Sequence, residues 1–275
     1  MQTVVSPGQT CLIVHRDAGW LACDPSLNAP RCGPIDLSPS AARTSTARSG
    51  KALLVADQRS VLELLTAVAG DWVKVPLSPP GSTDAAISPD GTKIAFSANT
   101  MQSIDANDIW IANVDGSGSK QLTDMPHLQH LPTWTPRGEI LFLSGRGDDH
   151  HDIWIVKPGD APRPLVQNHG YCFDPAMSDK GDLAFSSNKD GNYDIWLKPV
   201  AGGALRKIVA SPSFEGQPVF SPDGERLAYV VYDERGGHLR VHELATGRDE
   251  ALPIDGDIRN PIWIEGPCSG ILGKH

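Results

Sequence analysis

One sequence unit recurs along this chain of 275 residues, and no other feature limits the possible folds as strongly. Its first half reads AAISPDGTKIAF at residues 85–96, PTWTPRGEILF at 132–142, PAMSDKGDLAF at 175–185 and PVFSPDGERLAY at 218–229. Short apolar runs bounded by Pro-Asp-Gly and similar turns are typical of β-hairpins. The repeat therefore predicts an all-β protein rather than a helical one.

The second half of the unit and its period indicate how many strands each copy holds. It reads DIWIANV at 108–114, DIWIVKP at 152–158 and DIWLKPV at 194–200, with a degraded copy at 238–244 and a weaker unit around 50–77. The anchoring glycines lie 41, 47, 43 and 43 residues apart and are Gly50, Gly91, Gly138, Gly181 and Gly224. Such steps hold four short strands, which is the size of a propeller blade.

The two ends of the chain carry complementary halves of a further unit. The segment NPIWI at 260–264 repeats an opening strand but has no chain left to complete it, whereas residues 11–37 supply strands without an opening strand. We expect the C-terminal strand to join the N-terminal strands in one shared blade, which leaves no open sheet edge between the first and last units. Six four-stranded antiparallel blades in a single domain, residues 1–275, are predicted.

The pairing of S-P-D-G-x-x-x-A-[FY] with D-I-W resembles the TolB-like six-bladed propeller family of bacteria, with a repeat of WD-like character. The resemblance covers nearly the whole chain and implies the same fold. The family includes periplasmic scaffolds, peptidase-associated propellers and metal-dependent polysaccharide lyases, so the fold does not determine the function. TolB itself carries an additional N-terminal domain that this sequence does not show.

Charge and hydropathy exclude some partners. The formal net charge is −9, and no cluster of Lys and Arg suits phosphate neutralisation, so we expect no nucleic-acid binding. No window approaches 18 consecutive apolar residues, so no membrane insertion is expected, and no intact signal peptide is visible in the first 25 residues. A protein or peptide partner suits the chain better.

The residues that recur in each unit are expected to build the blade. Asp108, Asp152 and Asp194 each follow a turn, where a carboxylate accepts backbone N–H bonds. Trp110, Trp154 and Trp196 recur with the blade period, as core aromatic residues do.

Function is expected where equivalent positions differ. One residue per blade, immediately before the innermost strand, is predicted to face the mouth of the axial channel. Alignment on the repeat gives Arg43, Asp84, Leu131, Asp174, Gln217 and Asn260. Five of the six are polar, although blade packing gives no evident reason for this, while a bound ligand would. With neighbouring polar residues, the predicted ligand-binding set is Arg43, Asp84, His130, His169, Asp174, Glu215, Gln217, Arg259 and Asn260.

Two functions fit these residues. The first is a non-catalytic binding or scaffold propeller that receives a protein, a peptide or a small ligand at the mouth, with no certain cofactor. The second is a metal-dependent enzyme of the propeller lyase type acting on an acidic saccharide or a related small substrate. Its divalent ion would be held by His127, His130, His169 and Asp174. The first is preferred because no nucleophile and base pair is recognisable from spacing.

The cysteines bear on the cellular compartment. Four of the five fall in the predicted closing blade, where Cys11 with Cys268 and Cys23 with Cys32 are placed to pair. Disulfides favour an oxidising compartment, periplasmic or secreted, with a leader already removed. The alternative is a cytoplasmic protein with buried thiols. Cys172 is interpreted as a small packing residue.

Overall fold

The fold was analysed in a computed structural model. It describes residues 10–17, 19–24, 31–35, 41–46, 52–57, 62–66, 72–75, 82–99, 107–145 and 150–265; for 31, 35 and the segments between 41 and 75, only the backbone is described.

The described residues form strands and turns. The strands are β1 (Thr10–Arg16), β2 (Gly19–Asp24), β3 (Arg31–Ile35), β4 (Ala41–Thr46), β5 (Ala52–Asp57), β6 (Leu62–Thr66), β7 (Trp72–Val75), β8 (Thr83–Ile87), β9 (Lys93–Asn99), β10 (Asn107–Asn113), β11 (Lys120–Gln121), β12 (Gln129–Trp134), β13 (Ile140–Gly145), β14 (His151–Val156), β15 (Arg163–Val166), β16 (Cys172–Met177), β17 (Leu183–Ser187), β18 (Asp194–Lys198), β19 (Arg206–Val209), β20 (Phe214–Phe220), β21 (Arg226–Asp233), β22 (Gly236–Glu243), β23 (Asp249–Ala251) and β24 (Ile258–Glu265).

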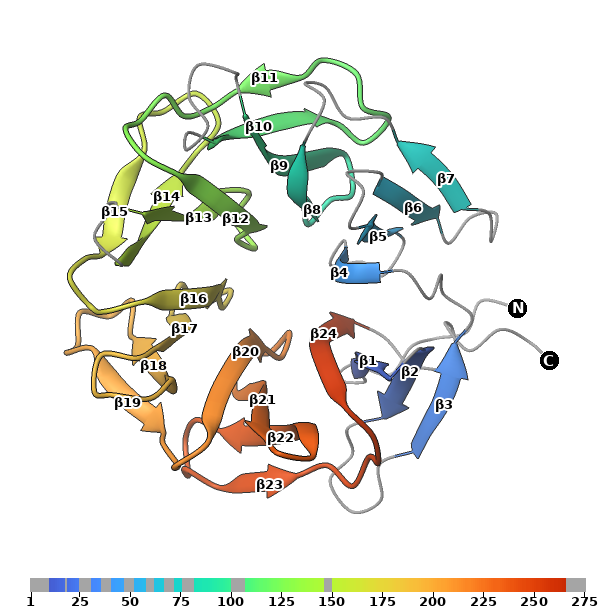
Figure 1. Ribbon diagram of the computed structural model, residues 1–275, viewed down its shortest axis with the longest axis vertical. Coiled ribbons are helices and arrows are strands. Elements are labelled where there is room, and N and C mark those ends of the chain that lie inside the picture. The colour runs from blue at the N-terminus through green and yellow to red at the C-terminus, as the bar shows by residue number, and fades with distance from the viewer. Residues whose placement is uncertain are drawn as a thin grey trace.

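These strands form six four-stranded sheets, each of consecutive strands except the one that joins the chain ends. Figure 1 shows the sheets arranged in a ring, with β4, β8, β12, β16, β20 and β24 nearest the centre. Within every sheet the neighbouring strands pair antiparallel, as the hairpin pattern predicts. The expected all-β propeller of four-stranded antiparallel blades is confirmed.

The ring closes through the C-terminal strand. β24 pairs antiparallel with β1, so that Leu12 lies opposite Trp263 and Cys11 opposite Ile264. The sheet order is β24-β1-β2-β3, which is the shared blade predicted from the incomplete units at the two chain ends.

Disulfides stabilise this closing blade. Cys23 in β2 and Cys32 in β3 are bonded to each other, as predicted, while Cys172 is a buried free thiol. Burial raises the pKa of the Cys172 thiol to about 12, which fits its predicted packing role. Cys11 is also disulfide-bonded. Its predicted partner, Cys268, lies outside the described residues, so that pairing stays a prediction.

The recurring glycines close one type of turn between the first two strands of a blade. The backbone N–H of Gly91 donates to Ser88 O over 2.8 Å, and Gly224 donates to Ser221 O over the same distance. Gly91 has φ of 74° and Gly224 of 69°, in the left-handed region that favours glycine. This conformational requirement explains why the repeat is anchored on glycine.

The recurring aromatic and acidic residues build the blades, as predicted. Trp154 packs in a cluster with Ala95 and Ile109 of the preceding blade, and Trp196 packs in a cluster with Leu143 of β13. The recurring aspartates bond to the outermost strand or the loop after it. Asp108 accepts from the Thr123 hydroxyl over 3.1 Å, and Asp152 accepts from the Asn168 N–H over 3.0 Å.

Candidate functional site at the channel mouth

The innermost strands of five blades begin with an irregularity that directs one residue toward the axis. Five residues that share this position have φ between 48° and 54°, namely Asp84, Leu131, Asp174, Gln217 and Asn260. In each of these strands the pairing register shifts at or beside that residue. A bulge of this kind bends the strand and redirects a side chain. We call these five residues the entry ring and the channel end that they surround the mouth.

The entry ring lines a cavity of about 170 Å³ on the axis, together with the residues that follow it in each strand. The sequence placed the same five residues at this position. The sixth, Arg43, lies in β4 at a register shift of the same kind, and its side chain is not among those described. Ligand binding by the entry ring stays a prediction.

The polar side chains of the ring link adjacent blades. The backbone N–H of Gln217 donates to Asp174 Oδ2 over 3.2 Å, and the N–H of Asn260 donates to Gln217 Oε1 over 2.7 Å. Asp and Asn also tolerate the left-handed backbone better than most residues do. The structure therefore corrects the premise that blade packing gives no reason for polar residues here.

A continuous series of aromatic rings adjoins the entry ring. Its members come from the start of the inner strands, from the loops before β16 and β18, and from β14 and β21. They are His130, His151, Tyr171, Phe173, Tyr193, Phe214 and Tyr232, and we call them the aromatic arc. Neighbouring ring centroids are 4.8 to 5.9 Å apart. These separations are typical of interacting aromatic pairs.

The arc joins the entry ring at β20. A Cβ built on Gly216 would lie 3.1 Å from the Phe214 ring and 3.8 Å from Asp174 Oδ2. Because Gly216 has no side chain, the Phe214 ring can lie close to the backbone at this point. Phe214 is 39% exposed, one of the two large apolar side chains most open to solvent among the described residues. The junction thus presents an aromatic surface beside a carboxylate.

Burial favours the uncharged forms of three titratable members of the arc. It lowers the pKa of His151 and raises the pKa of Tyr193 and of Tyr232. At neutral pH the His151 imidazole is therefore neutral and packs edge-on against Tyr171 and Phe173. The arc behaves as an apolar surface with polar edges.

Two predicted ligand-binding residues lie inside the blades instead of at the mouth. His169 is 4% exposed, and its ring packs edge-on against Trp196 at 4.4 Å. Desolvation, with a smaller contribution from Lys189, lowers the pKa of His169 to about 4. Glu215 is fully buried, and its carboxyl accepts a hydrogen bond from Ser211. Desolvation raises the pKa of Glu215. The sequence analysis expected both side chains at the mouth, whereas both turn into the interior of the blades.

Of the other predicted residues, Arg259 is exposed and His130 is half-buried. Arg259 forms an ion pair with Asp257 at 2.7 Å, and His130 contacts His151 within the arc. Across the residues with described side chains, no three His, Cys, Asp or Glu come together to hold a metal ion. The predicted ligands His127, His130, His169 and Asp174 are not gathered in such a group: His169 is buried against Trp196 and His130 packs within the arc, so a metal site there stays a prediction.

Sequence reasoning missed most of the arc. It singled out histidines, amides and charged residues, and His130 is the one arc member in the predicted ligand-binding set. Tyr171 and Phe214 both lie three positions before the entry ring, and Phe173 lies one before it. The alignment that gave the ring would have given these three. Tyr193, in the loop before β18, and Tyr232, in β21, could be placed only with the fold.

Comparisons with known proteins agree with this architecture. No family model matches the chain. A TolB homolog from Chlorobium luteolum is 28% identical over 158 residues, which are 58% of this chain and 36% of that protein. The uncharacterized peptidase YuxL of Bacillus subtilis is 28% identical over 151 residues, 54% of this chain and 21% of that protein. The chain thus spans about a third or less of the length of these curated relatives.

The fold comparison extends the likeness to most of the chain. The crystal structure of TolB from Acinetobacter baumannii superposes with a TM-score of 0.74 at 19% identity, covering 93% of this chain and 66% of that one. Over the described segments, no helix has the length and apolar character needed to cross a membrane. With distant TolB homologues in sequence and TolB among its structural neighbours, the chain is a TolB-like β-propeller.

Proposed function

We propose that this protein is a non-catalytic binding propeller that recognises a protein or peptide at the channel mouth. The observation that carries the proposal is the aromatic arc, seven contiguous rings beside the entry ring. Tyr, Trp and Arg dominate the energetics of protein interfaces, and rigid aromatic rings lose little entropy on binding.

The proposed partner places apolar or aromatic groups on the arc and a hydrogen-bond donor at the mouth. Asp174, next to Phe173 in sequence, supplies a carboxylate where the arc meets the entry ring. Arg259, which like Asp174 lies near Tyr232 of the arc, supplies the opposite charge and is paired with Asp257. A cationic group of the partner fits the first and an anionic group the second.

The domain and its compartment belong to the same proposal. Residues 1–275 form one six-bladed domain, and the protein acts in the periplasm or outside the cell. The Cys23–Cys32 disulfide supports an oxidising compartment. The metal-dependent alternative has no comparable support among the described side chains.

Affinity capture from an extract of the source cells tests the proposal. The bait is the wild-type protein, the mouth variant Phe214→Ala, or Glu225→Gln, an exposed charge change in the turn after β20. We expect one stoichiometric partner with the wild type and with Glu225→Gln, and a strong loss with Phe214→Ala. Equal capture by all three would contradict binding at the mouth.

A further inference from the structure

Two buried carboxyl groups meet at the boundary between the blade of β16–β19 and the blade of β20–β23. Asp194 begins β18 and is 1% exposed, and Glu215 lies in β20 and is fully buried. Their side chains lie within hydrogen-bonding reach of each other. Within the described part of the chain, Asp194 Oδ1 and Glu215 Oε2 are both buried without a hydrogen-bond donor. We call these two residues the acid pair.

One proton explains this contact. An ionised carboxylate only accepts hydrogen bonds, so two of them in contact repel, whereas a protonated carboxyl can donate to its neighbour. Asp194 Oδ2 forms an ion pair with Lys207 Nζ at 2.5 Å, which places a cation beside this carboxylate. Glu215 accepts from the uncharged hydroxyl of Ser211. Desolvation and the Asp194 charge raise the pKa of Glu215, although the Ser211 hydrogen bond acts in the opposite direction. Glu215 is therefore the member that holds the proton and donates a hydrogen bond to Asp194.

The repeat does not require an acid at position 215. Glu215 lies two positions before the entry-ring residue Gln217. Four other blades carry uncharged residues at the same position, namely Ser82, Gln129, Cys172 and Ile258. At the preceding blade boundary Cys172 lies near Asp152, so the equivalent contact there joins an acid to a neutral thiol. The pairing of two acids is therefore a departure from the repeat at this boundary, and not a consequence of the fold.

The acid pair is joined to the aromatic arc through its neighbours in sequence. Tyr193 precedes Asp194, and Phe214 precedes Glu215. The rings of Tyr193 and Phe214 lie 4.8 Å apart, and this contact carries the arc from one blade to the next. The Glu215 N–H also donates to Tyr193 O over 2.9 Å. A change of spacing between the two acids is therefore expected to move the two rings relative to each other.

Other charged and titratable side chains surround the acid pair. They are Lys207, Asp190, Lys189 and His169 around β18 and β19, and Tyr193, Asp174, Tyr232 and Arg259 toward the mouth. Lys207 stays a cation, because Asp194 and Asp190 raise its pKa. His169 is neutral above its pKa of about 4. Above the ordinary range of a glutamate, the change of charge at the pair thus falls on Glu215.

We propose that the acid pair is a proton-dependent lock that keeps this section of the arc in its binding form, an inference that rests on the proposed partner binding at the mouth. Release of the Glu215 proton to solvent leaves two carboxylates in contact inside the protein, and their repulsion separates β18 from β20. Tyr193 and Phe214 then move apart and interrupt the arc. Partner affinity is therefore expected to fall as the pH rises through the titration of Glu215.

Carbon-13 NMR of the protein without a partner tests the lock itself. The side-chain carboxyl resonance of Glu215, assigned by its absence in Glu215→Gln, should titrate with a midpoint above the ordinary glutamate value of 4.5. The ring resonances of Tyr193 and Phe214 should shift with the same midpoint. Glu215→Gln introduces the residue type of Gln129, so the fold should be retained, and its rings should show no shift in this pH range. A midpoint at or below the ordinary value, or rings that do not respond, would overturn the proposal.

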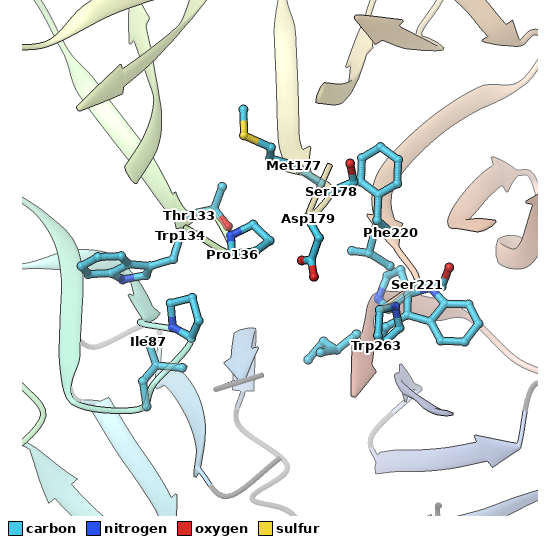
Figure 2. A pocket seen from close by; sticks show the side chains of 16 residues that line it. Ile87, Thr133, Trp134, Pro136, Met177, Ser178, Asp179, Phe220, Ser221 and Trp263 are labelled. Atoms are coloured by element: carbon cyan, nitrogen blue, oxygen red, sulfur yellow. The ribbon is translucent and has the colours of Figure 1, made fainter. Parts of the chain in front are cut away.

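The dissociation constant of the captured partner, measured across the same pH range, tests the regulation. For the wild type it should rise by about tenfold through the titration, and by reciprocity a bound partner should raise the Glu215 midpoint by about one pH unit. Glu215→Gln keeps a neutral hydrogen-bond donor at every pH, so its affinity should remain high. Asp179→Asn is the control. It removes an exposed carboxyl from a second channel cavity of about 250 Å³ beyond the end of β16 (Figure 2), and it should retain the wild-type pH dependence.

The outcomes separate this inference from the proposed function. Equal pH dependence in the wild type and in Glu215→Gln would contradict the regulation while leaving binding at the mouth intact. If Phe214→Ala captured the partner as well as the wild type does, the proposed function would fail and the regulation with it, whereas the NMR titration would still report on the lock.

Discussion

Gln217 and Asn260 are joined by two hydrogen bonds across a blade boundary. Gln217 Oε1 accepts from the Asn260 backbone N–H over 2.7 Å, and Gln217 Nε2 donates to Asn260 Oδ1 over 3.1 Å. The contact lies between the inner strand of one blade and the C-terminal strand that closes the ring. The side chain of an entry-ring residue therefore helps to hold the closing blade in place.

Shortening the Gln217 side chain is expected to destabilise the closed ring of blades. Gln217→Asn retains a residue that tolerates φ of 54°, but it is one methylene too short to reach Asn260. The loss of a partner by this part-buried N–H predicts a decrease of about 1 kcal/mol in the free energy of unfolding. Urea denaturation measures it. Gln167→Asn, at an exposed position, is the control and should stay within about 0.5 kcal/mol of the wild type.

The opposite effect is expected at Leu131. This residue has φ of 53° without a side chain suited to the left-handed region, whereas its equivalents are Asp, Gln and Asn. Leu131→Asn relieves a conformational cost of roughly 1 kcal/mol. The midpoint of thermal unfolding should then rise by about 2 to 4 °C. A lower midpoint would show that leucine packing at this position outweighs the backbone strain.

The pH dependence of stability should reveal the buried imidazole of His169. Its pKa of about 4 is below the ordinary value near 6.5, so the unfolded chain binds the proton more readily. Its contribution to stability is complete above pH 6.5 and is lost as the pH falls toward 4.

Replacing the imidazole tests this linkage. His169→Phe should reduce the difference in unfolding free energy between pH 7 and pH 4 by about 3 kcal/mol. Glu215, whose pKa is raised, changes stability in the opposite direction, so only the difference between variant and wild type isolates His169. Val166→Ala, a core change without a titratable group, should lower the free energy of unfolding equally at pH 7 and at pH 4. An unaltered difference in His169→Phe would contradict the assigned pKa.

Thiol counting tests the disulfides of the closing blade. Protein purified from an oxidising compartment and denatured without reductant should show one reactive thiol, that of Cys172. Replacing Cys23 and Cys32 together by alanine opens a loop of sequence separation 9, which predicts a loss of about 2 to 3 kcal/mol in unfolding free energy. Three thiols would show that one of the two bonds is absent, and five would exclude both.

The repeat was sufficient to predict the architecture. Its period gave four strands per blade, and the incomplete units at residues 11–37 and 260–264 gave the closure, because a strand without a partner must find one elsewhere. The same alignment placed Asp84 and Asp174 on the channel. These features depend only on a residue's position in the repeat, and that position can be assigned from the sequence alone.

Side-chain direction could not be derived in the same way. His169 and Glu215 are near the ring in sequence, but they turn into the blades, where Trp196 and Ser211 contact them. Whether a polar residue faces solvent or the interior depends on strand alternation and on the bulge at the ring, and neither is visible as a motif. Two arc members could not be predicted, because Tyr193 and Tyr232 approach Phe214 only when the loop before β18 and strand β21 are brought beside β20.

The most direct test of the central claim is the dissociation constant of the captured partner for single-site variants at the two ends of the channel. For a partner bound on the aromatic arc, Phe214→Ala should raise this constant at least tenfold, as truncation of a central aromatic anchor does. Phe220→Leu, at the opposite end of β20, should change it by less than about twofold, the level of a residue outside the interface. The reverse pattern, with full affinity in Phe214→Ala and a large loss in Phe220→Leu, would contradict recognition at the mouth.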